Sequence, residues 1–281
     1  MKEKVPVNKI IPFSAVDGPG NRTAVFLQGC NFNCLYCHNP ETRNLCRNCG
    51  ACIQGCPGQA LSMQEGQVRF QPERCLSCDA CIRGCPYGSS PRIWYLDRDQ
   101  VFDRIKKQMP YIRGVTVSGG ECTLYPEFLQ SLFEKCREEG LGTLLDSNGT
   151  LDFSLYPQLL EVTDGVMLDV KAWGREDHRR VTGEDNGLVL KNLRTLAERG
   201  KLYEIRTVVV PGLFDFRETV REAAALGAKY LDRGDIRYKL ISYRPMGVRR
   251  EYAHFPVPEA GQMEELAGIV REAGIRDIRI L

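Results

Sequence analysis

Cysteine spacing constrains this chain more than any other feature. Eleven of its thirteen cysteines fall within residues 30–85, where they form one run of three and two runs of four. An odd total argues against a disulfide framework, and the chain opens on charged residues rather than on an apolar secretion signal. We therefore expect a cytoplasmic protein whose free thiols bind metal.

The two runs of four repeat one spacing, Cys-x2-Cys-x2-Cys-x3-Cys-Pro, beginning at Cys46 and at Cys75. Bacterial ferredoxins with two [4Fe–4S] clusters use this spacing, and the fourth cysteine of each run binds the other cluster. One cube is expected on Cys46, Cys49, Cys52 and Cys85, and a second on Cys75, Cys78, Cys81 and Cys56. Zinc sites are the alternative. Two such clusters could carry electrons or brace a surface for a partner, and the spacing leaves both uses open.

The run of three, Cys30-x3-Cys34-x2-Cys37, is a different kind of site. Three thiolates can hold three irons of a [4Fe–4S] cube and leave the fourth iron free to chelate a small molecule through amino and carboxylate groups. A zinc knuckle with His38 as the fourth ligand has the same spacing. The spacing alone permits both.

The remainder of the chain alternates strand and helix patterns. A short apolar run at 22–28 predicts a buried strand before the cysteines. Further strands are expected at 114–118, 143–146, 166–170, 202–210 and 237–241, with a last one at 275–281; helices are expected at 97–109, 126–139, 153–161, 188–199, 216–226 and 258–272. This alternation implies a parallel sheet with right-handed crossovers. About six units fit, fewer than the eight of a closed barrel.

We therefore predict an α/β fold, a partial (β/α)6 TIM-like barrel interrupted after its first strand. The core would comprise residues 1–40 and 92–281, and residues 41–91 would form a ferredoxin-like insert with two [4Fe–4S] clusters. Ligands of such barrels bind at the carboxyl ends of the strands. The polar motifs discussed next all fall at those ends.

Several segments resemble the signature of the glycyl-radical enzyme activating enzymes, which are radical S-adenosylmethionine (SAM) proteins similar to pyruvate formate-lyase activase. They are Asp17-Gly-Pro-Gly-Asn-Arg22, Phe26-Leu-Gln-Gly-Cys30 and Tyr36-Cys-His-Asn39, and the resemblance covers most of residues 10–247. It implies a radical SAM barrel in which Cys30, Cys34 and Cys37 bind the catalytic [4Fe–4S] cluster. Tyr36 and the backbone at His38 would flank SAM.

The resemblance also implies roles for the later strand ends. Gly119, Gly120 and Glu121 would approach the amino group of the SAM methionine, although an ordinary turn has the same sequence. Asp146, Ser147, Met167 and Asp169 would bind a monovalent cation, and Asp169, Val170 and Lys171 would lie at the SAM carboxylate or ribose. A structural ion pair is the alternative for the charged residues. Asp17, Arg22 and Arg206 would contact a substrate peptide.

The chain departs from the family pattern in places. Several activases have a histidine after the sixth strand, where this chain has Tyr243-Arg244-Pro-Met-Gly247, so Arg244 either replaces it or faces solvent. Cys122 stands where proline is common, and we expect Cys122 and Cys136 to be buried thiols. Within the activases, the short insert and the segment 243–249 look most like the YjjW group.

The resemblance implies an oxidoreductase that reduces SAM by one electron to methionine and a 5′-deoxyadenosyl radical. That radical would remove hydrogen from a glycine of a partner glycyl-radical enzyme, with a flavodoxin or ferredoxin as reductant. The alternatives are a radical SAM enzyme for a small molecule or RNA base, and an electron-transfer ferredoxin. A net charge of +2 does not indicate a nucleic-acid binder, and Arg249-Arg250 reads as solvated surface. The longest apolar run, Val208-Val209-Val210, is too short to span a membrane.

Overall fold

Nine strands form one mixed sheet in the computed structural model, which describes residues 3–281 of the chain. Met1 and Lys2, with which the expected core begins, lie outside the described residues. The strand order is β11-β10-β9-β8-β7-β6-β2-β1-β5. The strands are β1 (Val5–Ser14), β2 (Arg22–Leu27), β5 (Trp94–Leu96), β6 (Gly114–Gly119), β7 (Gly142–Ser147), β8 (Gly165–Asp169), β9 (Leu202–Val209), β10 (Arg237–Ser242) and β11 (Asp277–Ile280).

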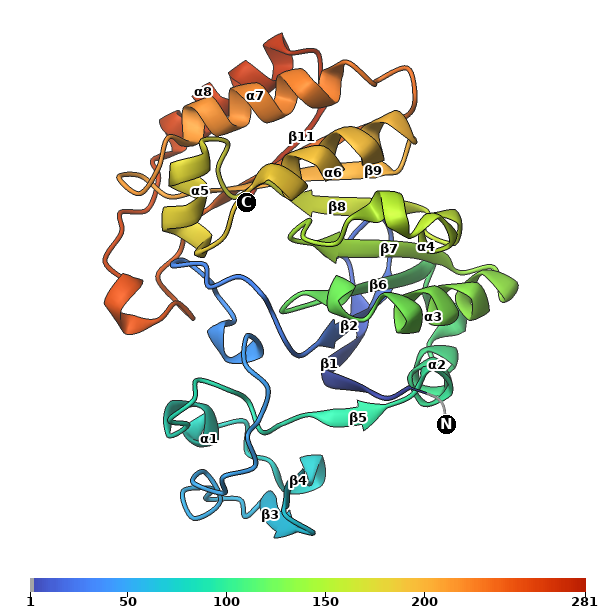
Figure 1. Cartoon of the computed structure of the whole chain (residues 1–281), viewed down its shortest axis with the longest axis vertical. Coiled ribbons are helices and arrows are strands. Elements are labelled where there is room, and N and C mark those ends of the chain that lie inside the picture. Colours follow the sequence, from blue (N-terminus) through green and yellow to red (C-terminus); the bar gives the residue numbers. More distant parts are fainter. Residues whose placement is uncertain (1–2) are drawn as a thin grey trace.

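From β2 to β11 the neighbouring strands are parallel. Their connections return each time to the same edge of the sheet, so the carboxyl ends meet on one side (Figure 1). The arrangement confirms the α/β class and is consistent with a partial TIM-like barrel. All the expected strands are present, the last of them as β11.

The sequence patterns do not predict β1 and β5, which extend the sheet in antiparallel fashion beyond β2. β1 contains Pro6 and Pro12, and proline normally argues against a strand because it cannot donate a ladder hydrogen bond. The pairing of β1 with β2 shifts register between Val7 and Lys9 and between Ile11 and Ser14. Pro12 falls in the second of these irregular stretches, where the ladder is interrupted.

Helices follow the strands as expected, with two exceptions. The helices that follow the strands are α2 (Arg98–Lys106), α3 (Pro126–Glu138), α4 (Pro157–Glu161), α5 (Arg175–Thr182), α6 (Gly187–Glu198), α7 (Phe216–Ala228) and α8 (Ala260–Glu272). The helix expected at 153–161 is split into a 3-10 turn and α4, because Tyr156 precedes Pro157 and leaves helical geometry (φ −124°, ψ 58°). The short helix α5 was not predicted, since its mostly charged sequence lacks an apolar period.

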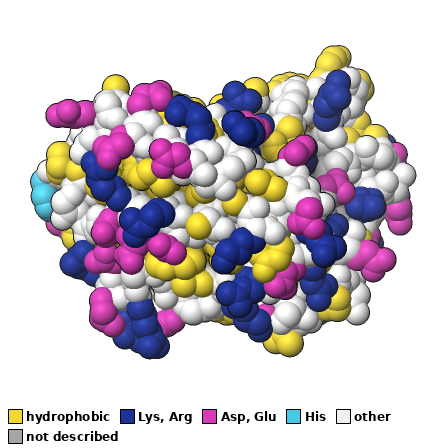
Figure 2. Space-filling view, turned by 90° about the horizontal axis from the view of Figure 1, so that it is seen from above, with side chains coloured by type: hydrophobic (Ala, Val, Ile, Leu, Met, Phe, Trp, Pro, Cys, Tyr) yellow, Lys and Arg dark blue, Asp and Glu magenta, His cyan; other side chains and the backbone are white. Residues whose placement is uncertain are grey.

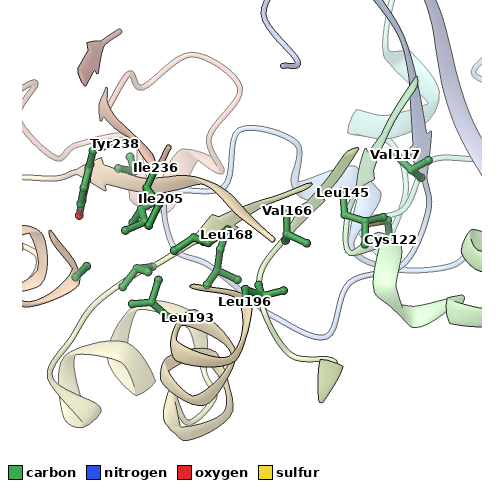
Figure 3. Packing of buried hydrophobic residues seen from close by; sticks show 14 of the residues in the cluster. Val117, Cys122, Leu145, Val166, Leu168, Leu193, Leu196, Ile205, Ile236 and Tyr238 are labelled. Carbon is green, nitrogen blue, oxygen red and sulfur yellow. The ribbon is translucent and has the colours of Figure 1, made fainter. Parts of the chain in front are cut away.

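Apolar side chains of the strands pack against the helices on the outer face of the sheet (Figure 3). Leu193 and Leu196 of α6 lie close to Leu168 of β8, and all three are fully buried. Each buried leucine stabilises the fold by about 1.5–3 kcal/mol. Because this face supplies an apolar core, the opposite face of the same strands can carry buried polar groups such as Arg206.

The later part of the chain between β2 and β5, from about residue 45 to 93, leaves the sheet and folds apart from the helices that cover it (Figure 1). It contains the antiparallel pair β3 (Leu61–Gln64) and β4 (Gln67–Phe70), the short helix α1 (Ala80–Arg83), and its own cluster of buried side chains, Cys52, Leu61 and Cys81. The two ends of this stretch meet in a β-bridge between Asn44 and Ser89. The Gln28 amide ties that bridge to β2 by donating to the carbonyls of Glu41 and Asn44, both at 2.7 Å.

The surface carries charges of both signs. Figure 2 shows basic and acidic side chains intermingled over one face of the molecule. In the part of the chain that the structure describes, no helix has both the length and the apolar character of a membrane span.

Candidate active site

The cysteine loop (residues 30–38) follows β2 and has no regular secondary structure. Backbone hydrogen bonds hold it on both sides. Cys30 donates its N–H to the carbonyl of Arg43 (2.9 Å), and Leu35 donates to the carbonyl of Val181 near the end of α5 (2.9 Å). The loop is therefore anchored to two separate parts of the protein.

The thiols of Cys30, Cys34 and Cys37 border two cavities of about 320 Å³ each. We call the one over the sheet the barrel-side cavity and the one shared with Ile82 and Gly88 the insert-side cavity. Burial raises the pKa of Cys30 to about 12 and the pKa of Cys34 to about 11. Thiolates in this position need the positive charge of a metal group.

The donor set fits a cluster that leaves one iron open. Cys30, Cys34 and Cys37 line cavities that have room for a group larger than a single ion. The Nε2 of His38, the fourth ligand of the zinc alternative, is already engaged, since it donates to the carbonyl of Arg244 (2.9 Å). The geometry favours the three-thiolate set.

The floor of the barrel-side cavity is made by the carboxyl ends of the strands. Its polar lining comprises Ser118, Gly119, Gly120, Glu121, Asp146, Ser147, Asn148, Asp169, Lys171 and Arg206, together with Tyr36, His38 and Asp17. The structure thus brings most of the residues singled out in the sequence into one cavity with the three thiols. The Tyr36 hydroxyl is buried and has no hydrogen-bond partner among the described residues. A bound molecule could supply that partner.

Two ion pairs cross this cavity floor. The Lys171 ammonium lies 2.7 Å from Asp169, and the Arg206 guanidinium lies 2.8 Å from Asp146. Burial works against both cations, yet Asp169 raises the pKa of Lys171, and Asp146 and Glu204 raise the pKa of Arg206. Both side chains therefore stay charged, and the cavity holds fixed charges of both signs.

The two glycines at the end of β6 are required by close backbone contacts. Gly119 has φ +130°, and a Cβ there would lie 2.1 Å from the carbonyl oxygen of Leu27. A Cβ on Gly120 would lie 2.3 Å from the carbonyl oxygen of Gly29. The end of β6 lies so close to β2 and to the start of the cysteine loop that no side chain fits at these two positions. An ordinary turn would not require glycine at both.

Glu121 is a buried carboxylate with all its bonds made inside the protein. One oxygen accepts from the N–H and hydroxyl of Thr123 and from the Ser147 hydroxyl, and the other accepts from the N–H of Asn148 (2.6 Å). Burial raises the pKa of Glu121, while these donors oppose the rise. Its side chain joins the ends of β6 and β7.

Asn148 also lines the barrel-side cavity, although the sequence analysis does not identify it. Its Nδ2 donates to Asn31 (3.0 Å) and lies 3.8 Å from the Cys30 sulfur. Apolar walls from Phe26, Val208 and Ile241 also escaped the sequence reading, since apolar strand residues look like ordinary core. Sequence spacing does not reveal such contacts, because they depend on which face of each strand points into the cavity.

Other expected site residues lie elsewhere. Arg22 is 4% exposed, and its guanidinium donates to the Thr116 hydroxyl and to the carbonyls of Val115 and Gly142, near the amino ends of the strands. The structure therefore does not bring Arg22 to the cavity. Val170 belongs to the apolar core, although its N–H bonds the Arg206 carbonyl (2.9 Å).

Four further side chains test expectations from the sequence. The Arg244 side chain is exposed, so it faces solvent. Cys122 and Cys136 are fully buried, as expected. The reading of Arg249 as solvated surface is wrong, because its guanidinium donates to the carbonyls of Asn33 (3.3 Å) and Cys34 (3.1 Å).

The two runs of four cysteines have matching local geometry. Cys46 and Cys75 each accept from an amide two residues on, and Cys56 and Cys85 each accept from an amide four residues on, at 3.3–3.4 Å. Positive φ angles recur at equivalent places, at Asn48 and Ser77, Gly50 and Asp79, and Gln59 and Gly88. Cys46, Cys49, Cys52 and Cys85 line one small cavity. The two runs of four cysteines are therefore duplicated in structure as well as in sequence.

Comparisons with known proteins identify the family. A model of the radical SAM superfamily matches residues 24–224. A Haemophilus influenzae protein named among the glycyl-radical enzyme activating enzymes is 30% identical over 98% of this chain and 95% of its own length. The pyruvate formate-lyase-activating enzyme of Streptococcus mutans is 32% identical over 86% of this chain and 78% of its own.

A solved structure supports the fold. A domain of the pyruvate-formate lyase-activating enzyme from Bacteroides vulgatus aligns with a TM-score of 0.51 and 23% identity, over 60% of this chain and 98% of that domain. The sequence relatives favour an activating enzyme over the small-molecule and ferredoxin alternatives. The chain belongs to the radical SAM superfamily and, within it, to the glycyl-radical enzyme activating enzymes.

Proposed function

We propose that Cys30, Cys34 and Cys37 hold the catalytic [4Fe–4S] cluster and that the barrel-side cavity binds SAM. When bound, the cluster supplies an electron that cleaves SAM to methionine and the 5′-deoxyadenosyl radical, which takes a hydrogen atom from a glycine of the partner enzyme. The observation that carries the proposal is the single cavity shared by the three thiols and four strand ends.

The strand ends can receive the charged groups of SAM. The backbone at Gly119 and Gly120 faces the cysteine loop and would accept the methionine amino group. Lys171 would receive the carboxylate or ribose while Asp169 holds it in place (2.7 Å). Arg206 already contacts Asp146 (2.8 Å) and the Met167 sulfur (2.9 Å), so a monovalent cation there would have to displace a guanidinium.

The partner's glycine would enter through the barrel-side cavity, where Asp17 lies on the wall. A carboxylate there could hydrogen-bond the backbone of an extended peptide. Arg206 is less available for this, because Asp146 and Glu204 both engage it. Of Asp17, Arg22 and Arg206, only Asp17 therefore remains as a contact for the substrate peptide.

Residues 41–91 would carry two further [4Fe–4S] clusters with crossed ligands. The cavity lined by Cys46, Cys49, Cys52 and Cys85 supports that crossing. Ile82 and Gly88, close in sequence to Cys81 and Cys85, line the insert-side cavity together with the catalytic thiols. This nearness favours electron relay from a flavodoxin or ferredoxin over a purely bracing role.

A pair of cysteine variants tests this division of labour. In the anaerobically reconstituted protein with dithionite, SAM should change the electron paramagnetic resonance (EPR) signal and yield 5′-deoxyadenosine. Cys34→Ala should abolish both readouts, since it removes a ligand of the open cluster. Cys49→Ala should keep both. Equal loss in the two variants would refute the assignment of SAM to the first run.

A further inference from the structure

The segment that follows β10, residues 243–252, runs back across the cysteine loop, and we call it the strap. Tyr243 begins it by donating its N–H to the carbonyl of Val209 (3.1 Å). The Tyr243 hydroxyl then donates to the carbonyl of Tyr252 (2.9 Å) and closes the segment on itself. Internal bonds therefore give the strap a defined shape without a long helix or strand.

The first contact between the strap and the cysteine loop is at the C-terminal end of the loop, at His38. The His38 ring stacks near the Tyr243 ring, with centroids 6.4 Å apart, and its Nε2 donates to the Arg244 carbonyl (2.9 Å). Gly247 has φ +87°, and a Cβ there would lie 2.6 Å from the His38 carbonyl oxygen. The strap thus lies directly against the residue that follows the last thiol.

Arg249 makes a second contact in the middle of the loop. Its Nη2 donates to the carbonyls of Asn33 (3.3 Å) and Cys34 (3.1 Å). The guanidinium stacks over the Tyr252 ring, 4.7 Å from its centroid, and its Nε is buried without a partner among the described residues. These contacts hold a planar cation beside the insert-side cavity, which the three thiols also line.

From this geometry we infer that Arg249 is a positioning residue for the catalytic cluster. It fixes the two peptide carbonyls that flank Cys34 and keeps a positive charge near the thiolates. A nearby cation favours the more negative, reduced state of a cluster and raises its reduction potential. The inference rests on the proposed cluster at Cys30, Cys34 and Cys37.

Three variants separate charge from geometry. Arg249→Gln keeps a donor but removes the charge, and Arg249→Lys keeps the charge but loses the planar fork. Arg250→Gln is the matched control, because Arg250 is the next residue and is exposed. In the reconstituted full chain, two quantities are measured. They are the midpoint potential of the SAM-responsive EPR signal and the rate at which a chelator removes the iron of that cluster.

We expect Arg249→Gln to shift the midpoint potential to a more negative value and to speed iron loss several-fold. Arg249→Lys should keep a potential near that of the wild type and still lose iron faster. Arg250→Gln should match the wild type in both measurements. The inference is overturned if Arg249→Gln behaves like Arg250→Gln. If the wild-type protein shows no SAM-responsive EPR signal, the proposed function is refuted, and so is this inference.

Discussion

Glu121 illustrates how a single residue organises the site. Its carboxylate is 1% exposed and accepts four hydrogen bonds from Thr123, Ser147 and Asn148. Two of the donors are backbone N–H groups, which can only donate. Both oxygens of the side chain are therefore needed where β6 and β7 end.

Glu121→Gln should destabilise the protein by about 1–3 kcal/mol, because an amide NH2 would face a backbone N–H and leave it unsatisfied. Chemical denaturation of the purified protein measures the change in unfolding free energy. Glu127→Gln, at an exposed site in the first turn of α3, is the control and should change little. Equal stability of the two variants would show that the Glu121 bonds contribute nothing.

At the residue scale, the sequence predicts where the cysteines lie far better than where the arginines lie. The spacing of a cysteine run indicates a metal site, and Cys30, Cys34 and Cys37 do line one cavity. Arg22 and Arg249 belong to segments that give no such signal. Their partners, Gly142 for one and Cys34 for the other, are 120 and 215 residues away along the chain. Only the folded backbone reveals which arginine is buried.

At the scale of elements, the contact of β6 with β2 makes a sharp test. Gly119→Ala should lower stability by roughly 3 kcal/mol or more, because the new Cβ meets backbone at a positive φ that alanine avoids. Gly268→Ala, in the middle of α8, meets nothing within 4 Å and should raise stability by about 0.5–1 kcal/mol. Thermal or chemical unfolding compares them, and similar values would contradict the close approach.

The insert offers a second test, of ligand crossing. Three cubes would give about twelve irons per chain, and each lost cube removes about four. With crossed ligands, the Cys46→Ala/Cys85→Ala double variant loses one cube and Cys46→Ala/Cys56→Ala loses two. Uncrossed ligands give the reverse order. Iron analysis after anaerobic reconstitution decides between them.

Periodicity predicted the parallel strands and most helices, since each buried strand is a short apolar run and each covering helix has one apolar face. It missed β1, whose prolines argue against a strand, and α5, whose charges hide its buried face. Yet α5 is the element that supports Leu35 of the cysteine loop. Local sequence could not reveal a role that depends on tertiary contact.

At the scale of the whole molecule, the cysteine loop is the point where three parts meet. The sheet lies on one side, the insert approaches through Ile82 and Gly88, and the strap crosses through Arg249. Under the proposed function, electrons from residues 41–91, SAM in the barrel and the partner's glycine would meet at this loop.

The most direct test of the account is glycyl-radical formation on a partner. The reconstituted chain is incubated anaerobically with SAM, a reductant and candidate glycyl-radical enzymes, and the partner is examined by EPR. We expect a glycyl-radical signal that requires SAM and disappears with Cys34→Ala. SAM cleavage without a glycyl radical on any candidate, and with the 5′-deoxyadenosyl radical instead consumed by a small molecule, would contradict it.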